Sequence, residues 1–368
     1  MNKGLPRWAD LVLIPLLNLG LALFVSGLVV LFIGEDPFEA VKVLIVGALG
    51  NSETIGFTLY YATNFIFTGL AVAIAFHAGL FNIGGEGQAN VAGIGVAIAA
   101  LGLGETHWAL VFLLATLLGG LFGAIWAAIP GYLQATRGSH VVITTIMFNF
   151  IAASLSVYLL VHVMKVEGSM VPESATFHPS GYLPFISDMF ASLGFEISKT
   201  PLNISFLLAL AASFGVWLLV WKSKLGYAIR TVGFSQGAAL YGGISPARIT
   251  IIVMAISGGL AGLMAVNEIA GAQHRLLLGF TAGYGFVGIA VALMGRAHPV
   301  GIFFASILFG MLYQGGGELA FEIPAITRDM IVVIQGLVIL FTGAMEYMFV
   351  PMLLRIFAQF RTSDEGAT

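Results

Sequence analysis

The stretch SKLGYAIRTVGFSQGAALYGGISPA (residues 223–247) lies between two strongly apolar runs, residues 204–222 and 248–270. It is too polar and too rich in glycine for a membrane-spanning helix, yet small and apolar residues such as Ala228 and Val232 recur in it at helical spacing. This pattern predicts short helices that lie on a membrane surface. The apolar runs on either side are long enough to cross a bilayer, so the stretch divides a membrane protein into two parts.

The composition supports a membrane protein. Of the 368 residues, 59% are hydrophobic and 9% are charged, and the mean hydropathy is +0.99. A soluble domain usually has about 25% charged residues, so lipid is the solvent for most of this chain. The net charge is −3 and no basic stretch indicates a nucleic-acid partner. The chain has no cysteine, which excludes disulfides, thiolate metal sites and cysteine nucleophiles.

Ten apolar runs of about 20 residues predict an all-α, polytopic membrane fold. They cover residues 10–33, 55–76, 83–102, 108–132, 140–163, 204–222, 248–270, 281–295, 299–315 and 328–350. The first run is too long for the core of a signal peptide, and we interpret it as an uncleaved membrane helix.

Lys and Arg predict the orientation of these spans, because basic residues are retained on the cytoplasmic side. With ten spans, both termini lie on one side. That side holds Lys3, Arg7, Arg137, Lys222, Lys224, Arg230, Arg248, Arg296, Arg355 and Arg361. The other side holds Lys42, Lys165, Lys199, Arg275 and Arg328. We therefore expect both termini in the cytoplasm, an external loop over 164–203, and a cytoplasmic segment over 223–247.

The second to fifth spans start outside, whereas the seventh to tenth start inside. Two four-helix blocks of opposite topology predict an inverted repeat. The similar segments GLAVAIAF (69–76) and GLAGLMAV (259–266) are the sequence support for this repeat.

Several catalytic and cofactor motifs are absent from the sequence. There is no Gly-Lys pair, so the chain has no P-loop for ATP, and it has no H-E-x-x-H metal motif. The segment GYGFVG (283–288) matches a dinucleotide-binding pattern by letter, but it lies inside an apolar span with no preceding strand. We interpret its glycines as close helix contacts. The small-xxx-small pairs Gly119/Gly123 and Gly258/Gly262 have the same interpretation.

Polar residues are concentrated in FHAGLFNIGGEGQANVAGIG (residues 76–95). A carboxylate at the bilayer centre costs about 2.5–3.5 kcal/mol on insertion scales, so Glu86 needs a reason to be there. It either caps a helix N-terminus or, with the neighbouring amides, lines a water-filled path at a broken helix; we favour the broken helix. Asn149, in the middle of another span, either lines the path or hydrogen-bonds a neighbouring helix.

Four segments together resemble the permeases of bacterial ABC importers for ribose, branched-chain amino acids and nucleosides. They are GLFNIGGEGQ (79–88), SHVVITTIMFNFIA (139–152), TVGFSQGAALYGGIS (231–245) and GYGFVGIAVALMGRAHPVGI (283–302). The resemblance runs in order across roughly residues 55–345 and is nearest to the simple-sugar and nucleoside branch. It implies a single transmembrane permease domain over 1–368 with the fold of a type II ABC importer.

The resemblance implies that ATP is bound by a separate ABC subunit, which docks on a cytoplasmic coupling helix, and that the permease itself needs no cofactor. The matching docking positions are Gly233, Ala238, Ala239, Tyr241, Gly242 and Ile244. Family members usually have an Asn shortly after this glycine, whereas Phe234 and Ser235 follow it here. The resemblance also implies a second, related permease, usually a different chain in the nucleoside branch, and an extracytoplasmic substrate-binding protein.

The predicted function is import of a nucleoside or simple sugar across the bacterial plasma membrane. The candidates to line the path are Asn82, Glu86, Gln88, Asn149, Asn267 and Glu268. The alternative is a proton-coupled secondary transporter of a small polar solute, in which Glu86 and Glu268 carry the proton. The coupling-helix segment favours the ABC permease.

Overall fold

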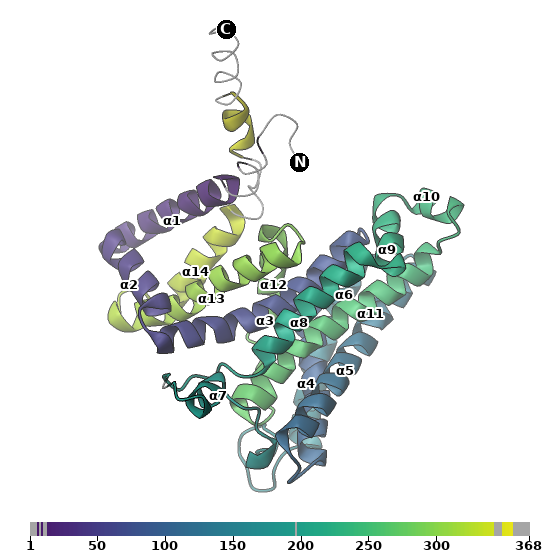
Figure 1. The fold of residues 1–368 in the computed structure, drawn as a ribbon, viewed down its shortest axis with the longest axis horizontal. Coiled ribbons are helices and arrows are strands. Elements are labelled where there is room, and N and C mark those ends of the chain that lie inside the picture. Colours follow the sequence, from purple (N-terminus) through teal and green to yellow (C-terminus); the bar gives the residue numbers. More distant parts are fainter. Residues whose placement is uncertain (1–5, 7–8, 10–12, 196, 342–347, 356–368) are drawn as a thin grey trace. The chain divides into compact units, whose positions relative to one another are not determined.

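The computed structural model of this chain describes residues 6, 9, 13–195, 197–341 and 348–355. These residues form helices and their connecting segments, which confirms the predicted all-α class (Figure 1). The chain folds into two compact units, residues 51–310 and residues 1–50 with 311–368. Parts of the sequence predictions lie outside the described residues: Lys3, Arg7, Arg361, the start of the first span at 10–12, and residues 342–347 of the last span.

The larger unit begins with α3 and contains most of the helices. They are α3 (Ser52–His77), α4 (Gly85–Gly102), α5 (Trp108–Arg137), α6 (Val141–His162), a 3₁₀ turn η2 (Pro179–Gly181), α7 (Ile186–Ser192), α8 (Ser205–Trp217) with its π-helical end η3 (Leu218–Lys222), α9 (Lys224–Phe234), α10 (Gln236–Tyr241), α11 (Pro246–Ala265) with its π-helical end η4 (Val266–Gln273) and α12 (Tyr284–Met294). Helix α13 (Pro299–Glu322) starts in this unit.

Among the described residues, seven helices are long and apolar enough to cross a membrane: α1, α3, α5, α6, α8 with η3, α11 with η4, and α13. The other three predicted spans correspond to α4 and to two shorter helices, α12 and α14 (Arg328–Ile339). Helix α12 has 11 residues, about 16 Å at 1.5 Å per residue, which is too short to cross a hydrocarbon core of about 30 Å by itself. The count of ten spans and the inverted repeat stay predictions.

Helices α5 and α11 cross at their glycines, and this contact is central to the larger unit. A Cβ added to Gly123 would overlap the carbonyl oxygen of Gly258, and a Cβ added to Gly262 would lie 2.5 Å from the carbonyl oxygen of Gly119. The two small-xxx-small motifs therefore face each other, which confirms that these glycines serve close helix packing. Two glycines of GYGFVG also lie in close contacts: Gly285 lies against the backbone of Glu86, and Gly288 lies against Thr68.

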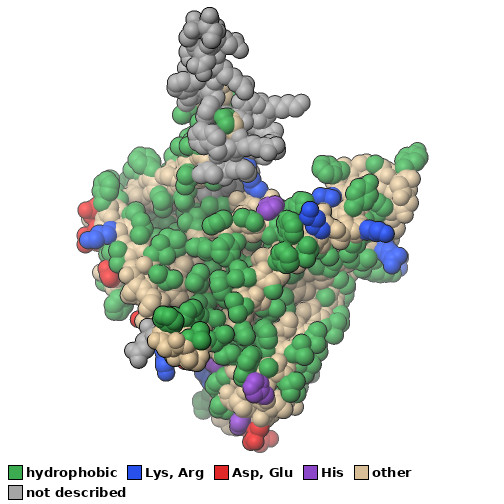
Figure 2. Space-filling model, in the orientation of Figure 1, with side chains coloured by type: hydrophobic (Ala, Val, Ile, Leu, Met, Phe, Trp, Pro, Cys, Tyr) green, Lys and Arg blue, Asp and Glu red, His purple; other side chains and the backbone are tan. Residues whose placement is uncertain are grey.

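The surface of the larger unit is largely apolar. Side chains such as Phe150, Leu117 and Phe214 are at least half exposed on helices long enough to span a membrane, as expected for a lipid-facing surface. Figure 2 shows apolar side chains over most of the visible face, with Lys and Arg side chains gathered around α9 and α10. Basic side chains gathered at one end of an apolar surface are typical of membrane proteins.

The smaller unit contains α1 (Ile14–Ile33), α2 (Pro37–Leu49), the end of α13 and α14. Its core joins Val30 and Ala40 to Leu319, Ile331 and Ile334. Helix α2 corresponds to no predicted span because its 13 residues are too short for one. Local signals set its start: Pro37 occupies the first turn, and the Asp36 carboxylate accepts a hydrogen bond from the amide of Phe38 (2.8 Å).

Candidate translocation site

The polar segment after α3 is a break between two helices. Residues 78–84 are not helical, and the chain becomes helical again at Gly85. The predicted broken helix is thus confirmed for Asn82, whereas Glu86 and Gln88 lie in the first turns of α4. The side-chain amides of Asn82 and Gln88 form a reciprocal pair with two hydrogen bonds of 3.0 Å, and both residues are 1% exposed.

Side chains from two other helices hold the break in place. The Asn82 amide donates to Ser257 Oγ of α11 (2.8 Å) and accepts from the amide of Gly84 (2.9 Å). Asn149 of α6 donates to the carbonyl of Ile83 (3.0 Å) and accepts from the amide of Gly87 (2.9 Å). These bonds satisfy backbone groups that the interrupted helix leaves without partners, which is a requirement for irregular backbone inside a membrane.

Glu86 caps the N-terminus of α12. Its Oε1 accepts from the amide of Gly283 and its Oε2 from the amide of Gly285, each at 2.9 Å. A carboxylate is favourable there because the first amides of a helix are unpaired and carry the positive end of the helix dipole. The capping contact is therefore present, but it serves α12 rather than the helix that contains Glu86.

A second polar cluster surrounds Glu268 in η4. Its Oε1 accepts from the Tyr60 hydroxyl (2.7 Å) and from the Asn64 amide (2.5 Å), both on α3. Its Oε2 accepts from Gln273 (3.1 Å). Glu268 is 3% exposed, and a carboxylate buried this deeply in an apolar unit needs such donors to offset its lost hydration.

Asn267 connects this cluster to the loop before α8. Its Nδ2 donates to Asn64 Oδ1 (2.9 Å), and its Oδ1 accepts from Asn203 Nδ2 (2.9 Å). Asn203 also accepts from the amide of Ser205 at the start of α8 (3.0 Å). The π-helical turn η4 is thus hydrogen-bonded on one side to α3 and on the other to the end of the loop 164–203.

The loop 164–203 also contacts the segment that follows η4. Glu173 forms an ion pair with Arg275 (3.2 Å), and the amide of Phe177 donates to the carbonyl of His274 (2.8 Å). The His274 ring lies against Tyr182, with ring centroids 3.6 Å apart. Burial lowers the pKa of His274, so this ring is neutral at pH 7.

The stretch 223–247 forms two short helices, α9 and α10, as predicted (Figure 1). Four of the predicted docking residues are exposed, whereas Ala239 is buried and Ile244 is partly buried. The exposed ones are Gly233, Ala238, Tyr241 and Gly242. Two further apolar side chains are exposed on this segment, Phe234 (91%) and Leu240 (63%), and neither was among the predicted docking residues. Gly233 has a further constraint, because a Cβ there would overlap the carbonyl of His77 at the end of α3.

Helix α10 and the break after α3 share one hydrophobic core. Ala239 of α10 belongs to a buried cluster with Ala75, Ala78 and Leu80, and Ile244 packs against it. Ala78 and Leu80 are in the break itself. The buried face of α10 and the residues next to Asn82 therefore belong to the same packed cluster.

The six predicted path residues lie in two groups. Asn82, Glu86, Gln88 and Asn149 surround the break, and Asn267 and Glu268 lie in η4. The sequence reasoning missed Tyr60, Asn64 and Asn203. Tyr60, Asn64 and Thr68 follow one another at i, i+4 spacing on α3, and this polar stripe was the available signal.

A family model described as "Branched-chain amino acid transport system / permease component" matches residues 15–343. The chain belongs to this family. The guanosine ABC transporter permease protein NupP of Bacillus subtilis is 34% identical over 339 residues, 90% of this chain and 93% of that protein. The glucose ABC transporter permease protein TsgB13 of Haloferax volcanii is 33% identical over 338 residues, 90% of this chain and 87% of that protein.

The nucleoside ABC transporter permease protein NupB of Lactococcus lactis subsp. cremoris is 33% identical over 321 residues, 86% of this chain and 85% of that protein. No solved structure is a significant match to this chain. The chain is thus a multi-pass ABC transporter permease, a transport protein and not an enzyme, because ATP hydrolysis in such systems takes place in a separate subunit. Membership in this family argues against the proton-coupled alternative.

Proposed function

We propose that this chain is the permease subunit that moves a nucleoside or a simple sugar into the cell. The relatives support this substrate class, because their names refer to guanosine, to nucleosides and to glucose. All are uncharged, hydroxyl-rich solutes, which hydrogen-bonding amides and carboxylates can recognise without a charged clamp. Of the two substrate classes, we favour the nucleoside over the sugar, because two of these three relatives are named for guanosine or for nucleosides.

The proposed path runs past the two polar groups. Asn82, Gln88 and Asn149 at the break, with Glu86, would offer hydrogen bonds at one level, and Asn267 and Glu268 at another. In this structure the residues at the break bond mainly to one another and to backbone groups, and Asn267 and Glu268 bond mainly to side chains of α3, of η4 and of the loop before α8. Exchange of these internal bonds for bonds to a solute would accompany opening of the path. Because a separate binding protein would deliver the solute, the path itself needs only weak affinity for that solute.

The observation that carries the transport mechanism is the hydrophobic core shared by α10 and the break. ATP binding would close the partner subunits against the docking residues of α10. Ala239 and Ile244 would transmit that movement to Ala78 and Leu80. The path would then open alternately to each side, as in transporters whose helix blocks rock around a fixed site.

The wider assembly follows from the same proposal. Family membership implies an ATP-binding subunit and a substrate-binding protein, and the ATP is bound by the partner rather than by this chain. We also propose that a second, related permease completes the complex, that the chain lies in the bacterial plasma membrane, and that both of its termini are cytoplasmic. The match over residues 15–343 supports one permease domain over 1–368, composed of both compact units.

The docking proposal is tested by Tyr241→Asp, because Tyr241 is 98% exposed and its replacement disturbs no packing. Gly233 is unsuitable, since any side chain there strikes the end of α3. An ATPase should co-purify with the tagged wild-type chain after gentle solubilisation. It should not co-purify with the variant, and uptake of labelled guanosine by cells with the variant should be at least tenfold lower. Met170→Asp, in the loop 164–203 and 97% exposed, is the matched control and should retain both.

Retention of the ATPase by Tyr241→Asp would contradict docking at α10. Glucose uptake without guanosine uptake would assign the sugar rather than the nucleoside. Wild-type cells that take up neither solute in an ATP-dependent manner would contradict the substrate class while leaving the docking result intact.

A further inference from the structure

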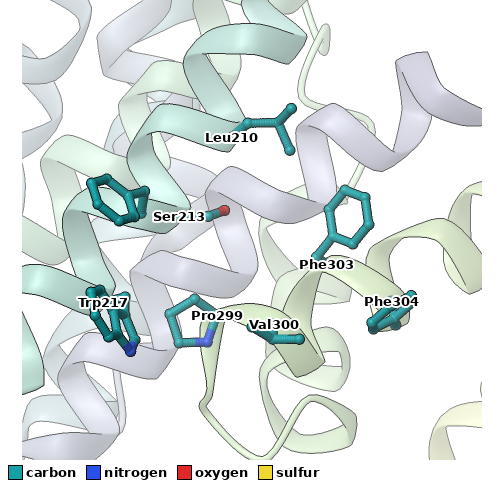
Figure 3. A pocket seen from close by; sticks show the side chains of 8 residues that line it. Leu210, Ser213, Trp217, Pro299, Val300, Phe303 and Phe304 are labelled. Carbon is teal, nitrogen blue, oxygen red and sulfur yellow. The ribbon is translucent and has the colours of Figure 1, made fainter.

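An apolar groove lies between α8 and the start of α13, away from both polar groups. Its volume is about 480 Å³. Leu210, Phe214 and Trp217 line it from α8, and Val300, Phe303 and Phe304 line it from α13. Figure 3 shows Leu210 and Trp217 of α8 on one side of this space and Phe303 of α13 on the other.

The groove is built for a hydrocarbon chain rather than for a polar solute. Its one hydroxyl, Ser213 Oγ, already donates to the backbone carbonyl of Ala209 (2.9 Å). Phe214, Val300 and Phe304 are each more than half exposed, so the groove opens sideways from the helices. In a membrane-spanning segment such a side opening faces the acyl chains of the bilayer.

A positive charge marks one end of the groove. The ammonium of Lys222 lies 5.5 Å from the centroid of the Trp217 ring, which forms the groove wall. Lys222 is the last residue of η3, and Lys224 follows two residues later; both are exposed. Trp221 and His298 pack together at the same end, with ring centroids 4.9 Å apart. Trp and Lys side chains together are typical of the bilayer interface.

The groove is shorter than one leaflet. From Leu210 to Trp217 the helix rises about 10 Å, whereas half of a hydrocarbon core is about 15 Å. The Lys222 ammonium lies beside the Trp217 ring at one end of the groove. An acyl chain that runs along the groove and past Trp217 would therefore have this ammonium close to its phosphate.

We propose that this groove binds one acyl chain of an anionic phospholipid, and that Lys222, with Lys224, holds its phosphate. Basic side chains between membrane helices at the cytoplasmic surface suit anionic headgroups. With the orientation proposed above, this site lies in the cytoplasmic leaflet, at the same end of the larger unit as α9 and α10. The site is independent of the identity of the transported solute.

The test measures lipid binding to the purified, delipidated transporter complex by native mass spectrometry, with dioleoylphosphatidylglycerol and dioleoylphosphatidylcholine as probes. The wild type should prefer phosphatidylglycerol. Lys222→Gln should weaken phosphatidylglycerol binding about fivefold, the value that corresponds to about 1 kcal/mol per basic side chain at an anionic surface, and leave phosphatidylcholine unchanged. Lys222→Arg should restore the preference.

Ser213→Trp fills the groove and should abolish the tight site for both lipids. Two controls match these changes: Leu117→Trp on the exposed face of α5, and Lys165→Gln in the loop 164–203; both should bind lipid as the wild type does. Equal affinity of the wild type for the two lipids would overturn the proposal. So would lipid binding that Ser213→Trp leaves unchanged, and if that variant also loses the second permease, the groove is a contact between protein chains.

Discussion

Glu86 is stabilised by backbone amides rather than by a basic side chain. Its two carboxylate oxygens accept the amides of Gly283 and Gly285, the first free donors of α12. Only a glycine at 285 allows this approach, because a Cβ there would overlap the backbone of Glu86. The partly buried carboxylate thus gains two charge-assisted hydrogen bonds, and two backbone amides at the start of α12 gain an acceptor.

Glu86→Gln should lower the free energy of unfolding by about 1 kcal/mol, because the amide keeps one acceptor but loses the charge that the helix dipole favours. Thermal unfolding in detergent measures this loss. Glu105→Gln is the control, since the Glu105 side chain is 86% exposed in the connection between α4 and α5. Unchanged stability together with lost uptake would instead assign the carboxylate to the solute path.

Helices α5 and α11 depend on the glycines at their crossing. Gly123→Ala should cost about 1–3 kcal/mol, the usual penalty for overpacking, because the new methyl group strikes the backbone of Gly258. Gly120→Ala is a control on the same helix, where the nearest atom would lie 3.8 Å away. It should be tolerated, since Ala also favours a helix over Gly by about 1 kcal/mol. Equal loss in both variants, measured by thermal unfolding, would mean that the crossing is not tightly packed.

The π-helical turn η4 is joined to the loop before α8 through Asn203. Gly271→Ala should break this link, because the added Cβ would overlap the fully buried Asn203 amide that bonds Asn267. We expect a loss of about 1–3 kcal/mol and reduced uptake. Gly215→Ala in α8, with open space around its Cβ, should change neither thermal unfolding nor uptake. A Gly271→Ala protein with wild-type uptake would exclude this link from the transport cycle.

At the scale of the whole molecule, the absence of cysteine allows a direct test of orientation, because any introduced cysteine is the only thiol. Tyr227→Cys on α9, at a position 62% exposed and outside the docking residues, and Met170→Cys in the loop 164–203, at a position 97% exposed, are suitable sites. A membrane-impermeant maleimide should label the second in intact spheroplasts and the first only after permeabilisation. The opposite pattern would invert the proposed topology.

Much of this fold could be predicted from hydropathy and from local chemistry. The break near Asn82 follows from glycines and amides in an apolar chain. Close helix contacts at the small-residue pairs of α5 and α11 could also be predicted, but not that the two pairs face each other. Helix α2 could not be predicted, because 13 residues do not form a membrane span. The hydrogen-bond partners of Glu86 and Glu268 could not be predicted either. They belong to α12 and α3, which are distant in the sequence and meet these carboxylates only through packing.

The glycine crossing has a mechanical consequence. Because a Cβ at Gly123 would overlap the backbone of Gly258, α5 and α11 touch there backbone to backbone and resist sliding past each other. Regular α-helical hydrogen bonding is interrupted elsewhere in the larger unit, at residues 78–84, in η4 and in η3. We expect a change of shape during transport to use these interruptions rather than the glycine crossing.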